Sequence, residues 1–435
     1  MSGQMTSPLL IESLAALLLR DVDEATTARA SCHLVDWIGC AAAGRNETAG
    51  SIVRSVEFPG ASGLAFRWGA FGNILEMDDV DKRAILHPGP TIIPAALALC
   101  ADQPKLLPKL FEAIVIGYEA TIRLGRATGP AHYGMWHTTG TCGAIGAAAA
   151  CSRLLGLDDL KTAHALSLAM SQAAGLWQTR HEPQSMGKQL HTSHAARAGL
   201  DAARLAASGF KGPLSVLEGE QGFFAACAPD GDPSVILKSY DVDWLIHQVS
   251  FKPWPACRHA HAAIDAALAI YESGFDLEKV DEIRITTYPD AIKFCDKPNP
   301  ASTIEAKFSL HHSVSVVLAK GKPEIQDFDS TAIQNPDFKR YRDKVSVVSG
   351  DPFESDYPQR YGAGIQLFSQ GSMVASAEAA DALGDPENPL SPQEIDEKSC
   401  VLMVHAGITL ENARQIVQLA GSPVPELLTN LLEML

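Results

Sequence analysis

Alanine- and leucine-rich segments that are apolar on more than one face dominate roughly the first 225 residues of this chain. Residues 147–150, for example, are four consecutive alanines. A helix that is apolar all round must be buried among other elements, and small residues let helix backbones approach closely. Glycine and proline separate the segments, as at Pro59-Gly60 and Gly129-Pro130. The pattern therefore predicts a bundle of closely packed helices.

The periodicity changes in the second half of the chain. Residues 280–288 alternate apolar and polar side chains, which is typical of a β-strand. Further short strands are expected at 344–348, 365–368 and 372–376, and the Ser369-Gln370-Gly371 segment favours a hairpin between the last two. A helical pattern returns after Ser391. The chain therefore combines a helical part with an α+β part.

These changes of pattern predict two domains, as the chain length also favours. We expect a discontinuous all-helical domain formed by residues 1–250 and 390–435, and an α+β domain formed by residues 251–389. The expected fold class is mainly α, with a large helical-bundle domain and a smaller α+β lid domain.

The charge balance excludes two classes of partner. The chain has 51 acidic and 35 basic residues and a formal net charge of −16, whereas nucleic-acid and membrane-surface partners require a basic face. No apolar run reaches the about 18 residues of a membrane span, and the N-terminus lacks the basic region of a secretory signal. Nine scattered cysteines without a Cys-x2-Cys pair fit reduced thiols in a cytoplasmic protein and give no signature of an iron–sulfur cluster.

Basic side chains gather in one short segment of this acidic chain. Residues 187–199 contain a lysine, two histidines and an arginine, with Lys188 and His191 first, and they lead into a small-residue helix expected at 195–207. Free backbone N–H groups at a helix N-terminus attract anions, as do cationic side chains. A basic surface turn is the simpler alternative. We favour a binding site for a small anion.

An acidic loop, Glu76–Asp81, precedes His87. Taken alone, a solvated loop is the simpler interpretation. The loop does not complete the magnesium motif Asp-Asp-x-x-Asp, because Lys82 stands where the last aspartate would be. Pro88-Gly89-Pro90 fixes the backbone after His87, just before an apolar helix. A histidine held in this way is the strongest candidate for proton transfer, with a structural cap as the alternative.

Three other polar clusters contain histidine. The turn His132–Thr141, with Tyr133 and His137, is rich in glycine and hydroxyl groups and opens an alanine helix; an N-cap with a core histidine is the alternative. Arg258-His259-Ala260-His261 contains a His-x-His pair that could bind zinc, but no third ligand has a suitable spacing, so a hinge is a strong alternative.

The last cluster combines Glu305-Ala306-Lys307 with His311-His312. Adjacent residues on a helix point about 100° apart, so we expect only one of the two histidines to face a functional site.

The order and spacing of these clusters match a known set of motifs over nearly the whole chain. The matching pieces are Asn73-x2-Glu76-Met77-Asp78-Asp79 with His87-Pro88, Tyr133-x3-His137-Thr138-Thr139-x3-Gly143, Lys188-x2-His191-x3-Ala195-Ala196-Arg197-x-Gly199, Trp254-Pro255-Ala256-Cys257 with His261, and Glu305-Ala306-Lys307-Phe308-Ser309. With them the chain resembles the MmgE/PrpD family, which includes 2-methylcitrate dehydratase, cis-aconitate decarboxylase and iminodisuccinate epimerase.

The resemblance implies an active site between the two domains, a homodimer, and no metal or organic cofactor. It implies a cofactor-independent lyase or isomerase acting on a small di- or tricarboxylate. Elimination of water, as in 2-methylcitrate dehydratase, is the first expectation, and epimerisation or decarboxylation of a related polycarboxylate is the alternative. The expected catalytic residues are His87, Asp78, Asp79, His137, Lys188 and His261, and the expected substrate-binding residues are Tyr133, His191, Arg258, Lys307 and His312.

This chemistry agrees with the residue types. Cations hold carboxylates, and histidines move protons near neutral pH. The sequence departs from the family pattern in a shorter segment between Gly44 and Asn73, in Val80 where many members carry threonine, and in His312 where dehydratases and decarboxylases tend to have tyrosine.

Two rival interpretations follow from the same residues. The first is a non-catalytic carboxylate-binding protein on the same scaffold. The second is a metal-dependent hydrolase that uses the side chains of Asp78, Asp79, His259 and His261.

Overall fold

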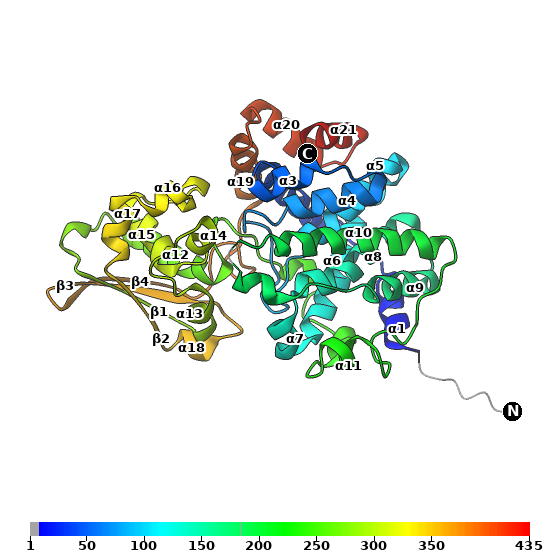
Figure 1. Ribbon diagram of the computed structural model, residues 1–435, viewed down its shortest axis with the longest axis horizontal. Coiled ribbons are helices and arrows are strands. Elements are labelled where there is room, and N and C mark those ends of the chain that lie inside the picture. Colours follow the sequence, from blue (N-terminus) through cyan, green and yellow to red (C-terminus); the bar gives the residue numbers. More distant parts are fainter. Residues whose placement is uncertain (1–7, 183) are drawn as a thin grey trace. The chain divides into compact units, whose positions relative to one another are not determined.

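The computed structural model describes residues 8–182 and 184–435. The chain divides into two compact units, one formed by the residues before Ser250 together with Ser391–Leu435, and the other by Ser250–Leu390. Within the described residues the first unit is built of helices and the second combines helices with one sheet (Figure 1). The predicted fold class, mainly α with an α+β part, is confirmed.

The α-helices of the helical unit have the following bounds: α1 Leu10–Leu17, α2 Glu24–Gly44, α3 Thr48–Ser55, α4 Gly60–Phe71, α5 Gly89–Asp102, α6 Leu110–Ala127, α7 Gly129–Met135, α8 Thr138–Leu155, α9 Asp159–Met170, α10 Gly187–Ala207, α11 Phe223–Cys227, α19 Pro392–His405, α20 Leu410–Ala420 and α21 Pro425–Met434.

Helix α8 forms the centre of the helical unit. It carries the alanine run, is buried along almost its whole length, and packs against α5, α6, α9 and α10. The contact with α10 is so close that a Cβ added at Gly199 would lie 2.4 Å from the Cβ of Ala147. Small side chains here therefore set the distance between helices, as the sequence predicts.

The C-terminal helix α19 packs on α2 of the same unit. Ser391 caps its N-terminus in a capping box with Glu394. Gly39 of α2 lies so close to Ser399 that a Cβ would be 2.7 Å from the Ser399 Cα atom. This packing brings Lys398 beside the start of the polar loop that follows α4, because its ammonium group donates to the Met77 carbonyl oxygen at 2.7 Å.

The second unit is built on a four-stranded sheet with the order β2-β1-β3-β4. Its elements are α12 His261–Glu272, β1 Glu282–Thr287, α13 Pro289–Cys295, α14 Thr303–Lys307, α15 Leu310–Lys320, α16 Ser330–Ile333, α17 Pro336–Arg342, β2 Val345–Ser349, α18 Phe353–Asp356, β3 Ala363–Ser369 and β4 Ser372–Ala379.

The sheet is mixed. Strands β1 and β2 are parallel, whereas β3 is antiparallel to both β1 and β4. The alternation predicted for residues 280–288 is present as β1, in which Ile283 and Ile285 are buried against the helices of the unit. The hairpin predicted around Gln370 joins β3 to β4, with an irregularity between Leu367 and Phe368.

The start of one helix differs from the one expected. Helix α10 begins at Gly187, well before residue 195, and the preceding helix α9 ends at Met170. The segment between them contains a short 3-10 helix, Trp177–His181. Lys188 and His191 therefore lie in the first turns of α10. None of the helices in the described part of the chain is both long and apolar enough to cross a membrane.

Candidate active site

The loop between α4 and α5 carries the first group of candidate residues. Glu76 has a φ of 60°, in the left-handed region that residues other than glycine rarely adopt. Such a conformation costs on the order of 1–3 kcal/mol and persists only where surrounding contacts hold it. Two contacts hold this part of the loop: the carboxylate of Glu76 pairs with the ammonium group of Lys188, and the Asn73 amide donates to Asp78 Oδ2 at 2.6 Å.

Asp79 anchors the loop to three helices. Its carboxylate lies 2.7 Å from His33 Nδ1 of α2, accepts the hydroxyl of Tyr118 in α6 at 2.5 Å, and accepts the backbone N–H of Gly89 at the start of α5 at 2.9 Å. Burial lowers the pKa of His33 to about 4 and raises that of Tyr118, so both remain neutral near pH 7. These contacts hold the loop in place, and a catalytic role of Asp79 stays a prediction.

His87 is held in one tautomer. Its Nδ1 atom lies 2.8 Å from the carbonyl oxygen of Asp79 and 3.0 Å from Asp78 Oδ2. Both neighbours are acceptors, so Nδ1 must carry the proton, and Nε2 of the neutral ring has a lone pair. The side chain is 14% exposed. The backbone is fixed as well, since the His87 N–H donates to Thr139 Oγ1 at 3.0 Å. This geometry suits a general base.

His137 and His191 form a second pair of rings. Their Nδ1 atoms lie 3.2 Å apart, and Trp177 packs against His137 with ring centroids 4.4 Å apart. Tyr133 meets Trp177 edge-on. Burial lowers the pKa of His137 well below its ordinary value and that of His191 to about 4. Two neutral rings that share this hydrogen bond carry their protons on different nitrogens, because only one Nδ1 can donate.

Lys188 lies close enough to act electrostatically on both rings. Its positive charge helps to lower the pKa of His137 and of His191, and His87 and Asp78 also affect the pKa of His137. The helical unit therefore brings together five of the predicted residues: Asp78, His87, His137, Lys188 and His191. Together they form a histidine-rich site within one unit, in which Lys188 is the cation and Asp78 a carboxylate.

Three residues next to this site were not singled out from the sequence, namely Asp36, Tyr118 and Lys398, and a fourth, Glu76, was named only as part of the acidic loop and the matched motif. Lys398 pairs with Asp36 at 2.5 Å as well as with the Met77 carbonyl. Burial raises the pKa of Asp36 to about 6 although Lys398 opposes this shift. Glu76 did carry a usable signal, since it belongs to the matched motif. The others are separated from the loop by tens to hundreds of residues, and only the tertiary fold shows their contacts.

The second unit holds its own buried charges. Arg258 pairs with Asp385, which also accepts the hydroxyl of Ser250 at 2.5 Å. His261 is fully buried, and its Nε2 lies 3.1 Å from the carbonyl oxygen of Ala256. Burial lowers the pKa of His261 well below its ordinary value, and Arg258 and Lys252 lower it further. The ring is therefore neutral near pH 7.

The rings of His259 and His312 are both enclosed by neighbouring side chains and backbone of the second unit. His259 lies 2.7 Å from the Tyr288 hydroxyl and stacks against Phe294 and Tyr361. His312 is fully buried in α15: its Nε2 lies 2.7 Å from the Asp327 carbonyl oxygen, and its Nδ1 lies 3.1 Å from Arg342 Nη1. Both nitrogens of His312, which the resemblance suggested as a substrate ligand, are thus occupied within the second unit.

Lys307 is buried at the end of α14, where its carbonyl oxygen accepts the N–H of Cys257 at 2.8 Å. His311 Nε2 lies 2.8 Å from Asp296 Oδ1. The side-chain hydrogen-bond partners of the two adjacent histidines are Asp296, Asp327 and Arg342, and none of these is a predicted site residue.

One acidic group in residues 8–182 and 184–435 could hold a metal ion by its spacing, namely Asp381, Asp385 and Glu387, with one ligand atom of each within 4.8 Å of the others. Arg258 neutralises Asp385, and Arg360 pairs with Asp381. The group contains none of the four side chains that the metal-dependent hydrolase requires.

Comparison with known proteins gives matches over most of the chain. Residues 60–236 match the MmgE/PrpD N-terminal domain and residues 254–420 match the MmgE/PrpD C-terminal domain. Human cis-aconitate decarboxylase is 30% identical over 65% of this chain and 60% of its own length. The cis-aconitate decarboxylase-like protein oryM of Aspergillus oryzae is 27% identical over 78% of this chain and 75% of its own length.

A 2-methylcitrate dehydratase of Escherichia coli is more distant, at 23% identity over 49% of this chain and 45% of its own length. The match thus covers less than two thirds of the length of the human relative and less than half of the length of the bacterial one. The two domain matches are complementary, follow one another in order, and include the loop, the α10 segment and the second unit described above. The chain belongs to the MmgE/PrpD family.

Proposed function

We propose that this chain is a lyase that acts on a small di- or tricarboxylate by acid–base catalysis, with elimination of water as the first expectation. The observation that carries the proposal is the fixed tautomer of His87. Its protonated Nδ1 faces Asp78 and the Asp79 carbonyl, which leaves a lone pair on Nε2. The names of the relatives, cis-aconitate decarboxylase and 2-methylcitrate dehydratase, support a carboxylate as the substrate.

His87 is the proposed base. Its Nε2 takes a proton from the carbon next to a substrate carboxylate, and the ring then carries a positive charge. Asp78, 3.0 Å from Nδ1, stabilises that charge. The reaction requires no change in the anchoring contacts of the loop, so the ring stays in position during proton transfer.

Lys188 is the proposed electrostatic anchor. Abstraction of a proton next to a carboxylate moves negative charge onto that carboxylate, and a fixed cation stabilises this charge most strongly in the transition state. An ammonium group has three N–H donors, and Lys188 pairs with Glu76 through this group. His137 is neutral and can donate a hydrogen bond to the departing hydroxyl group.

Decarboxylation is the second candidate, because human cis-aconitate decarboxylase has the higher identity of the relatives above. In that reaction a proton is added to the carbon that loses carbon dioxide, and the same two histidines can supply it. Epimerisation needs proton removal and return without loss of a group. The homodimer and the substrate contacts of Arg258, His261, Lys307 and Tyr133 stay predictions.

The test is incubation of the purified chain with citrate-, aconitate- and aspartate-like acids in D₂O, followed by NMR. An alkene signal shows dehydration, loss of carbon dioxide shows decarboxylation, and deuterium incorporation alone shows reversible proton transfer. The proposal predicts one of these with at least one acid, and we expect the activity to survive a chelator. Tight binding of an acid without any of the three outcomes would instead support the non-catalytic carboxylate-binding protein.

A further inference from the structure

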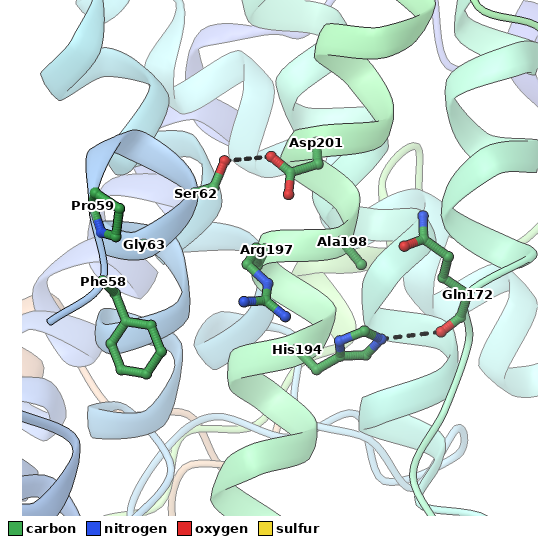
Figure 2. Close-up of a pocket in the computed structure, with 9 residues that line it drawn as sticks. All are labelled: Phe58, Pro59, Ser62, Gly63, Gln172, His194, Arg197, Ala198 and Asp201. Atoms are coloured by element: carbon green, nitrogen blue, oxygen red, sulfur yellow. Dashed lines mark hydrogen bonds between the residues drawn. The ribbon is translucent and has the colours of Figure 1, made fainter. Parts of the chain in front are cut away.

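A pocket of about 340 Å³ lies in the helical unit, and none of the residues named in the proposed mechanism lines it (Figure 2). It is bounded by the start of α4, by the middle of α10 and by Gln172 after α9. Pockets that bind small molecules have volumes of about 300–1,000 Å³, so this one is large enough for a small ligand. Its lining shares no residue with the Lys188 and His87 site.

Arg197 provides a positive charge in this pocket. Its guanidinium group makes no hydrogen bond or ion pair with residues 8–182 or 184–435, and it contacts the Phe66 ring, with 5.0 Å between the guanidinium carbon and the ring centroid. Figure 2 shows the group directed into the space between α4 and α10. A planar guanidinium group binds carboxylates through two parallel hydrogen bonds, so an open one suits this ligand.

Asp201 provides a negative charge one helical turn further along α10. The Ser62 hydroxyl donates to its Oδ1 atom, and no described residue bonds to the other oxygen. Arg197 and Asp201 stand four residues apart and yet are not within ion-pair distance. A basic residue that precedes an acidic one by four is the weaker orientation for such a pair. The pocket therefore presents two separate, opposite charges.

The rest of the lining is partly apolar. The ring of Phe58 packs on Phe66 with centroids 4.6 Å apart, and Pro59 and Ala198 also line the pocket. His194 Nε2 lies 3.1 Å from the carbonyl oxygen of Gln172, which fixes the opposite wall. An apolar group of a ligand would therefore find an aromatic surface next to the two charges.

We propose that this pocket binds a small zwitterion, an α-amino acid with an apolar side chain. Its carboxylate pairs with Arg197, its ammonium group pairs with Asp201, and its side chain packs on Phe58. A ligand with the carboxylate alone would bring a second negative charge to Asp201, and one with the amine alone would bring a second positive charge to Arg197. The pocket thus selects for molecules that carry both groups.

The experiment measures binding of three matched probes by isothermal titration calorimetry and by saturation-transfer NMR. L-Phenylalanine has both charged groups, 3-phenylpropanoate lacks the amine, and 2-phenylethylamine lacks the carboxylate. We expect L-phenylalanine to bind at least about tenfold more tightly than either analogue, the factor given by one good charge-assisted contact. Equal affinities for the three probes, or no binding of L-phenylalanine, would overturn the proposal.

Variants locate the site. Arg197→Gln and Asp201→Asn each remove one charge and should weaken L-phenylalanine binding about tenfold or more. Arg204→Gln is the matched control, because Arg204 is on the same helix but outside the lining, 3.9 Å from Asp102. Binding that Arg197→Gln leaves unchanged would contradict the assignment.

If Arg197→Gln does not fold, Arg197→Lys keeps the charge, loses the two-pronged geometry, and should still weaken binding. These titrations measure binding and do not depend on catalysis. This inference can therefore fail without affecting the proposed lyase activity, and the reverse also holds.

Discussion

Two histidines of this chain, both expected at the active site, have opposite environments. His87 lies in the loop before α5 with one nitrogen fixed by acceptors, and its side chain is partly exposed. His312 lies inside α15 with both nitrogens bound and its ring edge-on to Phe328 and Phe338. A histidine with an occupied Nδ1 and an open Nε2 can transfer protons, whereas one with two occupied nitrogens stabilises the fold.

The same contrast separates two aspartates that are adjacent in the sequence. Asp78 faces the reactive ring of His87, and Asp79 is enclosed by three donors from three helices. Motif matching predicts the same catalytic role for both aspartates. Their contacts differ: Asp78 is placed to act on the proposed base, whereas Asp79 holds the loop.

The sharpest test of this comparison is the exchange of each histidine for glutamine. His87→Gln should lower turnover by about 10²- to 10⁴-fold, the usual contribution of a general base, with an unchanged melting temperature. His312→Gln, the matched control, should keep turnover within a few-fold but unfold at a lower temperature. Steady-state kinetics and thermal unfolding of both variants measure this. Full turnover by His87→Gln would pass the role of base to His137.

Lys188→Ala should have the next largest effect. Removal of an anchor for developing charge typically costs about 10²-fold in kcat/KM, and more if Glu76 is then left as a buried, uncompensated charge. Lys188→Arg keeps the charge and serves as the control. We expect it to recover part of the activity. Near-normal kcat/KM in Lys188→Ala would place this residue in a surface turn without a catalytic role.

The pH dependence of stability should report on His312. Burial lowers its pKa to about 4 from an ordinary value of 6.5. The unfolded chain therefore binds a proton more readily between these values, and stability is lost as pH falls from 6.5 towards 4. One pKa unit corresponds to about 1.4 kcal/mol, so the loss from this residue approaches about 3 kcal/mol at pH 4.

Denaturant unfolding at several pH values measures this loss. His312→Gln removes the titrating group, so the free energy of unfolding of the variant should approach that of the natural chain as pH falls. A constant difference from pH 7 to pH 4 would show that His312 does not titrate differently in the two states.

Asp79→Asn should have the smallest effect on turnover of the variants of the proposed site. The amide keeps an acceptor for the Gly89 N–H but faces the Tyr118 hydroxyl and His33 with an N–H₂ group. An unsatisfied buried donor costs about 1–3 kcal/mol, so we expect a lower melting temperature. Turnover should fall far less than in His87→Gln, because the contacts of Asp78 remain. A loss of turnover as large as that of His87→Gln, at an unchanged melting temperature, would make Asp79 a catalytic residue.

Local patterns predicted the elements that make local contacts. The alanine run gave α8, and the alternation at 280–288 gave β1, because helix and strand periodicity depend on neighbouring residues. The start of α10 was placed too late, since Gly187 has weak helix propensity and the packing of Lys188 against Glu76 supports the first turn.

The site could be predicted only as a set of residues. Motif spacing indicated Lys188 and His137. The tautomer of His87, however, depends on the carbonyl oxygen of Asp79, eight residues earlier, which the turn of the loop places beside the ring. Glu76 adopts a left-handed backbone conformation that no pattern of side chains reveals. The interior position of His312 depends on Asp327 and Arg342, which only the folded unit places around it.

The contact between Lys398 and the Met77 carbonyl joins positions 321 residues apart. A ribosome adds about 5–20 residues per second, so the loop is synthesised roughly 16 to 64 seconds before its anchoring lysine exists. During that interval the nascent helical unit has α2 and the loop but lacks the ammonium group that neutralises Asp36. The finished geometry of the site is thus a late product of synthesis, and a nascent chain stalled before α19 will hold the loop without this contact.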